Sequence, residues 1–169
     1  MESGIKALEP PDSIYLNAAI GWLELGNWLE ANEELERITP ELRAHPNVLR
    51  LRWEIYASAE KWEMAVEVAR GLSEMLPDIS WGFIHYAFAL HCLKRTKEAY
   101  AVLIPVVDKF SDYLIRYNLA CYSCQLGNMK ESKQWLEKAI ELAGKKEIRL
   151  MALDDPDLKP LWKEIGSIA

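Results

Sequence analysis

A period of about 34 residues runs through most of this chain and constrains its fold more than any other feature. Ala31, Ala65 and Ala99 follow one another at this interval, and Ser132 comes one residue early in the next period. Repeats of this length are typical of solenoids, in which each unit is too small to bury its own apolar face and stacks on its neighbours. Two further columns in the same register are Ala19, Trp53, Ala87 and Ala120, and Trp22, Tyr56, Leu90 and Ser123.

The first unit shows what one period encodes. Residues 14–25 carry apolar side chains at helical spacing, and Gly26 and Asn27 then end the helix because both tolerate the left-handed backbone conformation. A second amphipathic stretch runs over residues 28–38. Small residues at Ala19 and Ala31 allow two antiparallel helices to approach closely. We therefore predict that each period forms a helical hairpin.

This arrangement of residues resembles the tetratricopeptide repeat, and the resemblance covers residues 13 to about 144. It implies an all-α fold, a right-handed superhelical solenoid of antiparallel helical hairpins. The positions of the second unit that match the family pattern are Trp53, Tyr56, Trp62, Ala65, Leu72 and Pro77. We divide the chain into an N-terminal segment (1–12), four hairpins (about 13–45, 46–79, 80–112 and 113–144) and a C-terminal capping region (145–169).

Three positions depart from the repeat pattern. Trp53 stands in a column that otherwise holds alanine, so the second hairpin must splay or twist to admit an indole. Pro105 falls within the second helix of the third unit, and we expect it to kink that helix or end it early. Lys94 replaces the glycine of the turn, which weakens the expected boundary between the two helices of the third unit.

The residues that follow Gly144 differ in character from the repeats. Leu158, Leu161, Trp162 and Ile165 present apolar side chains at helical spacing, and an open last repeat would expose its core. We therefore interpret residues 145–166 as a cap. The nearby acidic residues lack the glycine and the distal glutamate of a calcium-binding loop, so we predict no metal site there.

Composition and charge exclude several classes of function. The net charge of −6 argues against a nucleic-acid partner, because lysine and arginine are interspersed with glutamate instead of clustered. The longest apolar stretch, residues 100–107, is too short to span a membrane. The N-terminus shows no signal-peptide pattern, and three cysteines do not make a secreted disulfide framework. We expect a cytoplasmic protein.

No motif in the chain indicates catalysis. The three histidines have no serine or cysteine partner in a glycine-rich nucleophile turn, and no glycine-rich phosphate loop is present. Paired carboxylates occur only on helix faces that we expect to be solvated. We therefore predict neither an enzyme nor a cofactor.

The resemblance implies that function lies on the concave face, which the first helix of each unit lines. These positions are mostly apolar and aromatic and lack the Lys/Asn/Arg clamp with which some family members bind acidic chaperone tails. Such a surface suits an amphipathic helix or an extended hydrophobic peptide from another protein, with Trp81, Phe88 and Tyr117 as anchors. The positions, called the inner stripe below, are Leu16, Ile20, Leu23, Arg50, Glu54, Trp81, Ile84, Phe88, His91, Tyr117, Cys121 and Cys124.

Two alternatives remain open from the sequence. The same apolar residues could instead join two copies in a structural homodimer or scaffold, or pack against the N-terminal segment or the chain's own cap. Cys121 and Cys124 share one helix face, and Cys92 lies on the neighbouring hairpin. These three cysteines could bind a soft metal or act as thiols, although free cysteine is also a common core residue.

Overall fold

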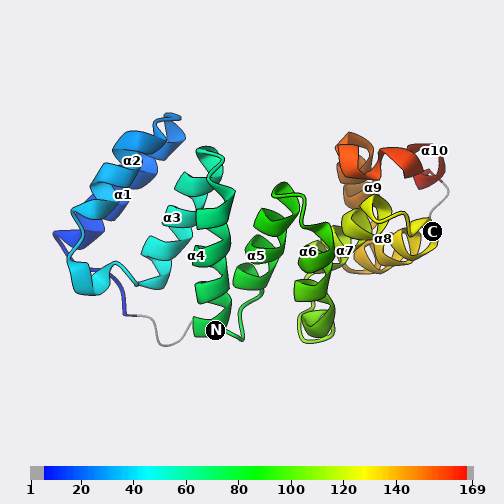
Figure 1. Cartoon of the computed structure of the whole chain (residues 1–169), viewed down its shortest axis with the longest axis horizontal. Coiled ribbons are helices and arrows are strands. Elements are labelled where there is room, and N and C mark those ends of the chain that lie inside the picture. Colours follow the sequence, from blue (N-terminus) through cyan, green and yellow to red (C-terminus); the bar gives the residue numbers. More distant parts are fainter. Residues whose placement is uncertain (1–5, 167–169) are drawn as a thin grey trace.

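The structure is a computed structural model that describes residues 6–166 of the 169-residue chain. Its helices form antiparallel hairpins that follow one another in a single row, and no strand occurs among the described residues (Figure 1). The prediction of an all-α right-handed solenoid is therefore confirmed. The hairpins pair α1 (Asp12–Glu24) with α2 (Trp28–Glu36), α3 (Pro46–Ser58) with α4 (Trp62–Met75), α5 (Ser80–Cys92) with α6 (Thr96–Leu103), and α7 (Tyr113–Gln125) with α8 (Met129–Ala143).

Short helical turns connect and end the row. The 3-10 turns η1 (Pro40–Leu42) and η2 (Ile104–Val106) follow α2 and α6. Helix α6 ends at Leu103, and Pro105 lies in η2, which confirms that this proline ends the helix early. After α8 the chain continues through α9 (Lys145–Asp154), η3 (Pro156–Leu161) and α10 (Trp162–Ile165).

Small residues lie where the two helices of each hairpin meet. Ala31, Ala65, Ala99 and Ser132 are all fully buried, and the Ser132 hydroxyl donates a hydrogen bond of 2.7 Å to the Ala120 carbonyl. Because no large side chain separates the backbones at these points, the larger residues around them can interdigitate. The 34-residue period is thus the repeat of one packing contact along the solenoid.

The first helix of every hairpin ends in the same turn. Gly26 and Gly127 have positive φ angles of 76° and 85°, and Glu60 and Lys94 take the same left-handed conformation at 54° and 63°. In each turn the following N–H reaches back to a carbonyl of the last helical turn, at 2.9 Å from Asn27 and at similar distances in the other three. Lys94 therefore leaves the third boundary intact, contrary to the expected weakening.

Trp53 fits into the solenoid by facing the third hairpin. Its indole is largely buried, and its edge contacts the ring of Trp81, with centroids 5.7 Å apart, and that of His85 at 4.5 Å. The indole that replaces an alanine of the repeat thus fills space between the second and third hairpins.

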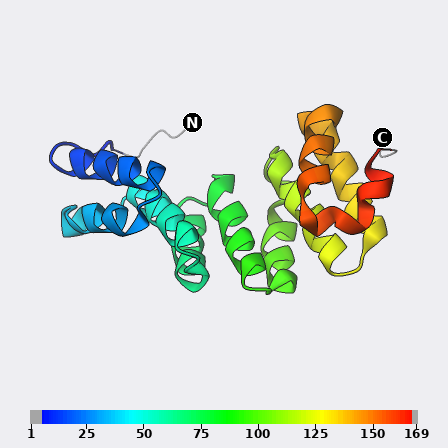
Figure 2. The ribbon, with the colours of Figure 1, turned by 90° about the horizontal axis from the view of Figure 1, so that it is seen from above.

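The C-terminal helices cover the last hairpin. Helix α9 packs on α8, and η3 packs on α7, as the orange and red segments against the yellow ones show in Figure 2. Ile148, Ala152, Leu158, Leu161 and Ile165 are all buried in this contact. Because η3 lies on α7, the chain turns back from the outer side of α8 towards the first helices of the hairpins.

The opposite end of the solenoid is less covered. Ile14 of α1 is 59% exposed, whereas Ile115, which holds the same repeat position in α7, is fully buried against the preceding hairpin. Within residues 6–166 no hairpin precedes α1, so this face of the repeat has no neighbouring hairpin to pack on.

Candidate protein-binding surface

The N-terminal part of the inner stripe faces solvent. Ile20 is 39% exposed, Phe88 is 41% exposed and Glu54 is exposed, while other members are half-buried. These residues come from α1, α3 and α5, the first helices of three successive hairpins, and we treat them as one candidate surface. This surface, called the open part of the inner stripe, comprises Leu16, Ile20, Leu23, Arg50, Glu54, Trp81 and Phe88.

Aromatic contacts hold the centre of the open part in place. Trp81 stacks on His85 one helical turn later, with ring centroids 3.7 Å apart and planes 13° from parallel. Phe88 packs against Trp53 and Trp62, with centroid distances of 6.3 and 5.9 Å. Rings fixed by their neighbours lose little conformational freedom when a partner covers them, which favours binding.

Few charges interrupt this aromatic surface. The Arg50 guanidinium lies 5.7 Å from the Trp81 ring centroid, a distance at which cation and ring attract each other. Burial lowers the pKa of His85 below its ordinary value, although a 2.8 Å contact of Nδ1 with the Trp81 carbonyl opposes this effect. The imidazole is thus neutral at neutral pH. Partial burial also raises the pKa of Glu54.

The C-terminal part of the inner stripe is covered by the chain itself. Tyr117, Cys121 and Cys124 are buried, and His91 is half-buried. The Tyr117 hydroxyl donates a 2.9 Å hydrogen bond to Oδ2 of Asp155, and Cys121 Sγ lies 3.4 Å from the same oxygen. These inner-stripe residues therefore contact the C-terminal region instead of solvent.

One inner-stripe residue within the open part's stretch of α5 is buried. Ile84 of α5 has little exposed surface and belongs to the main hydrophobic core. The twelve residues therefore lie on the four first helices, and those of the open part keep exposed or half-exposed side chains.

The three cysteines are free thiols that are buried or half-buried. Burial raises the pKa of all three thiols, most strongly for Cys121, so the reactive thiolate form is disfavoured at neutral pH. Cys124 Sγ lies 3.7 Å from the Met129 sulfur, which is a packing contact. Among residues 6–166, no group of three or more histidine, cysteine or acidic side chains is placed to hold a metal ion.

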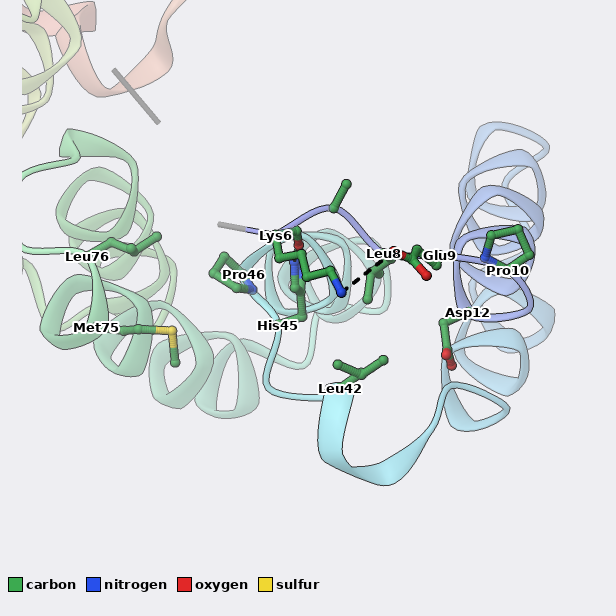
Figure 3. Close-up of a pocket in the computed structure, with 11 residues that line it drawn as sticks. Lys6, Leu8, Glu9, Pro10, Asp12, Leu42, His45, Pro46, Met75 and Leu76 are labelled. Atoms are coloured by element: carbon green, nitrogen blue, oxygen red, sulfur yellow. Dashed lines mark hydrogen bonds and ion pairs between the residues drawn. The ribbon is translucent and has the colours of Figure 1, made fainter. Parts of the chain in front are cut away.

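A separate pocket lies at the N-terminal end of the molecule, away from the inner stripe. Figure 3 shows its lining residues, which come from the N-terminal segment, the start of α1, η1 and the ends of α3 and α4. The pocket has a volume of about 580 Å³. Its polar groups already have partners, since Asp12 accepts a 2.6 Å hydrogen bond from the Thr39 N–H and His45 Nε2 lies 2.8 Å from the Lys6 carbonyl. The remaining lining is mostly apolar, from Leu8, Pro10, Leu42, Pro46, Met75 and Leu76.

Sequence reasoning missed two features of this surface. His85 was not assigned to the inner stripe, and its stacking on Trp81 is signalled only by their four-residue spacing. Packing of the stripe against the chain's own cap is one of the alternatives that the sequence leaves open, and it holds for Tyr117 and Cys121. The docking of Asp155 and Asp157 has no local signal, because it depends on the path of the chain after α8. The residues around the N-terminal pocket likewise come from segments that no motif connects.

In the described part of the chain, no helix has both the length and the apolar character needed to cross a membrane. This finding concerns residues 6–166.

The fold is similar to solved structures of MamA. A structure described as MamA 41-end from Desulfovibrio magneticus RS-1 matches with a TM-score of 0.71 at 18% identity, over 96% of this chain and 95% of that chain. A MamA RS-1 double mutant gives the same TM-score and identity over 96% and 94%. MamA AMB-1 matches with a TM-score of 0.62 at 16% identity, over 94% and 98%. These likenesses show a shared tetratricopeptide-like helical-repeat fold.

No protein-family model and no curated protein sequence matches the chain.

Proposed function

We propose that this chain is a non-catalytic protein-interaction module that binds a hydrophobic or amphipathic segment of another protein on the open part of the inner stripe. The observation that carries this proposal is the exposure of Phe88 beside Trp81 within a fixed aromatic cluster. Exposed apolar residues gathered on one side of a protein mark association sites, and aromatic residues supply much of the binding energy at such sites.

The exposed fractions set the expected strength of binding. Complete burial of a large apolar side chain contributes about 1.5–3 kcal/mol. Because Ile20 and Phe88 are already more than half buried, covering the remainder contributes about 1 kcal/mol for each residue. The cost of ordering a partner offsets part of this sum, so we expect a dissociation constant that is micromolar or weaker.

A substitution that places a charge on the open part tests the proposal. Phe88→Asp removes the exposed ring and introduces a carboxylate that a hydrophobic partner segment would have to desolvate. Met64→Asp is the matched control, because Met64 is similarly exposed but lies on α4, outside the inner stripe. Partners captured from lysate would be identified by mass spectrometry, and the bound segment titrated against the wild type and both variants by calorimetry.

We expect Phe88→Asp to weaken binding at least tenfold and Met64→Asp to leave it within twofold, with equal helicity for all three proteins. Equal weakening by both variants, or by neither, would contradict the proposal. A light-scattering comparison tests self-association: if Phe88→Asp only converts a dimer to a monomer, the open part joins two copies instead of binding another protein.

We also propose that the module acts in the cytoplasm. Cys92, Cys121 and Cys124 are all free thiols, and unpaired cysteines are typical of reducing compartments.

A further inference from the structure

A four-residue segment of the C-terminal region makes a concentrated set of polar contacts on α5 and α7. Oδ2 of Asp155 accepts from Tyr117 and Cys121. Oδ2 of Asp157 lies 2.7 Å from Nε2 of His91, and the Asp157 carbonyl accepts a 2.8 Å hydrogen bond from Gln125. Every partner on α5 and α7 donates, and every group of the segment accepts.

His91 and Tyr117 are donors whose geometry and protonation are set by their surroundings. His91 Nδ1 contacts the Thr96 hydroxyl at 2.9 Å, which fixes the imidazole and leaves Nε2 for the carboxylate. A carboxylate can only accept, so Nε2 carries the proton. Burial raises the pKa of Tyr117, so its hydroxyl keeps its proton and remains a donor. These features make α5 and α7 a pre-arranged acceptor-binding surface.

The segment itself is a compact turn. The Asp157 N–H donates a 2.9 Å hydrogen bond to Oδ1 of Asp155, which is the geometry of an Asx turn, and Pro156 between them restricts the backbone. Leu158 follows and is fully buried. A turn that holds its own shape can be recognised as a short linear motif, because little ordering is needed on binding.

Capping of the solenoid does not require these polar contacts. Ile148 and Ile165 lie against Leu136 and Ile140 of α8, and neither takes part in the contacts with His91 or Tyr117. The carboxylates reach beyond α7 to α5, on the preceding hairpin. The polar docking and the buried Leu158 side chain thus belong to one short segment, so a partner that displaces the segment must supply a leucine as well as the two carboxylates.

We propose that the inner faces of α5 and α7 form a receptor for a short acidic Asp-x-Asp-Leu turn, which residues 155–158 occupy in cis. A partner protein that carries an acidic turn of this chemistry binds there by displacing them. This receptor is distinct from the open part of the inner stripe, and it acts through hydrogen-bond donors where that surface acts through apolar burial.

A defined peptide tests the receptor without knowledge of the natural partner. The probe is a fluorescein-labelled peptide of residues 153–160, titrated by fluorescence anisotropy against the full chain. The variant Asp155→Ala/Asp157→Ala weakens the segment in cis and keeps every apolar residue of the cap. The matched control is Glu147→Ala/Asp154→Ala, which also removes two carboxylates but at exposed positions of α9.

We expect the Asp155→Ala/Asp157→Ala variant to bind the peptide at least tenfold more tightly than the wild type, whose own segment competes. The control should match the wild type. A peptide with asparagine in place of Asp155 and Asp157 should bind the variant at least tenfold more weakly than the unchanged peptide does. Equal binding to all proteins, or no loss with the asparagine peptide, would overturn the proposal.

Thiol reactivity provides a second measurement that needs no tight binding. Cys121 lies beneath Asp155, so its modification by a thiol reagent should accelerate at least tenfold in the isosteric variant Asp155→Asn/Asp157→Asn, and the peptide should slow it again. An unchanged rate would mean that the segment does not open. Light scattering on the same samples would reveal a dimer formed by exchange of the segment, which would assign the receptor to a second copy and overturn the role of a partner protein.

The peptide and thiol experiments and the Phe88→Asp test address different surfaces, so a negative result in one does not contradict the other proposal. Phe88 does not contact the C-terminal segment, and the peptide assay does not involve the open part of the inner stripe.

Discussion

Nε2 of His91 and Oδ2 of Asp157 lie 2.7 Å apart, although 66 residues separate the two in the sequence. The hydrogen bond from His91 lowers the pKa of Asp157 below its ordinary 3.8, burial opposes this effect, and the charges of His91 and Lys94 add to it. This contact ties the third hairpin to a segment that lies beyond the fourth.

The lowered pKa of Asp157 predicts a pH dependence of stability. A carboxyl whose pKa is lower in the folded state stabilises the protein above its unfolded pKa, and this contribution is lost as the pH falls through the folded pKa. We expect Asp157→Asn to be less stable than the wild type at neutral pH, with the difference closing below about pH 4. Urea midpoints measured across this range check the prediction.

Asp154→Asn is the control for this pH profile, because Asp154 is exposed. Its profile should run parallel to that of the wild type. If the profile of Asp157→Asn were also parallel, the contact with His91 would contribute nothing to stability.

Truncation of two isoleucines at the same repeat position should change the free energy of unfolding by very different amounts. Ile115→Ala should lower the free energy of unfolding by about 2–5 kcal/mol, because Ile115 is fully buried between the third and fourth hairpins. Ile14→Ala should change it by less than about 0.5 kcal/mol, because Ile14 is 59% exposed and no hairpin precedes it within residues 6–166. Denaturant unfolding of the two variants measures both values, and a large loss for Ile14→Ala would show that this face is covered in solution.

The repeat itself could be predicted because it rests on local rules. Alanine at the helix crossings, the turn after the first helix and the early end at Pro105 each follow from residues close in sequence. The fold class therefore follows from the period alone.

The covering of the C-terminal part of the inner stripe could not be predicted in this way. Whether Tyr117 and Cys121 face solvent depends on where Asp155 docks, and that position is set by tertiary contacts of α9 and η3. The periodic pattern places both residues on the inner side of α7 and contains no information about a later segment. The spacing of apolar residues along a helix does not predict long-range docking of this kind.

The shared turn geometry predicts that glycine would stabilise the two turns in which Glu60 and Lys94 hold the left-handed position. Glu60 adopts a left-handed backbone conformation, which costs a non-glycine residue about 1–2 kcal/mol. Glycine avoids this cost but loses more conformational entropy on folding, which offsets part of the gain. Glu60→Gly should therefore stabilise the protein by about 0.5–1 kcal/mol. Gly26→Ala should destabilise it by about 1 kcal/mol, because its added methyl group meets no atom within 4 Å and only the backbone strain remains. Thermal unfolding of both variants tests the pair, and a shift of equal sign would contradict it.

Two other glycines, in adjacent helices, predict effects of opposite sign for the same substitution. A Cβ atom on Gly82 of α5 would lie 2.6 Å from the Ser73 backbone nitrogen and 2.8 Å from the Ser73 Cα of α4, so two backbones would have to move apart. Gly82→Ala should destabilise the protein by about 1–3 kcal/mol or more. A Cβ atom on Gly71 meets nothing within 4 Å, so Gly71→Ala should stabilise α4 by about 0.5–1 kcal/mol through its higher helix propensity.

Urea unfolding of Gly82→Ala and Gly71→Ala, with circular dichroism as the probe, measures this difference. Gly82 holds the repeat position that Ile14 and Ile115 hold elsewhere, so its loss of stability would show that α4 and α5 approach more closely than helices at the other junctions. If Gly82→Ala were as stable as the wild type, the backbones of α4 and α5 could move apart at this contact without loss of stability. The polar receptor on α5 would then lack the rigid support that this close contact provides.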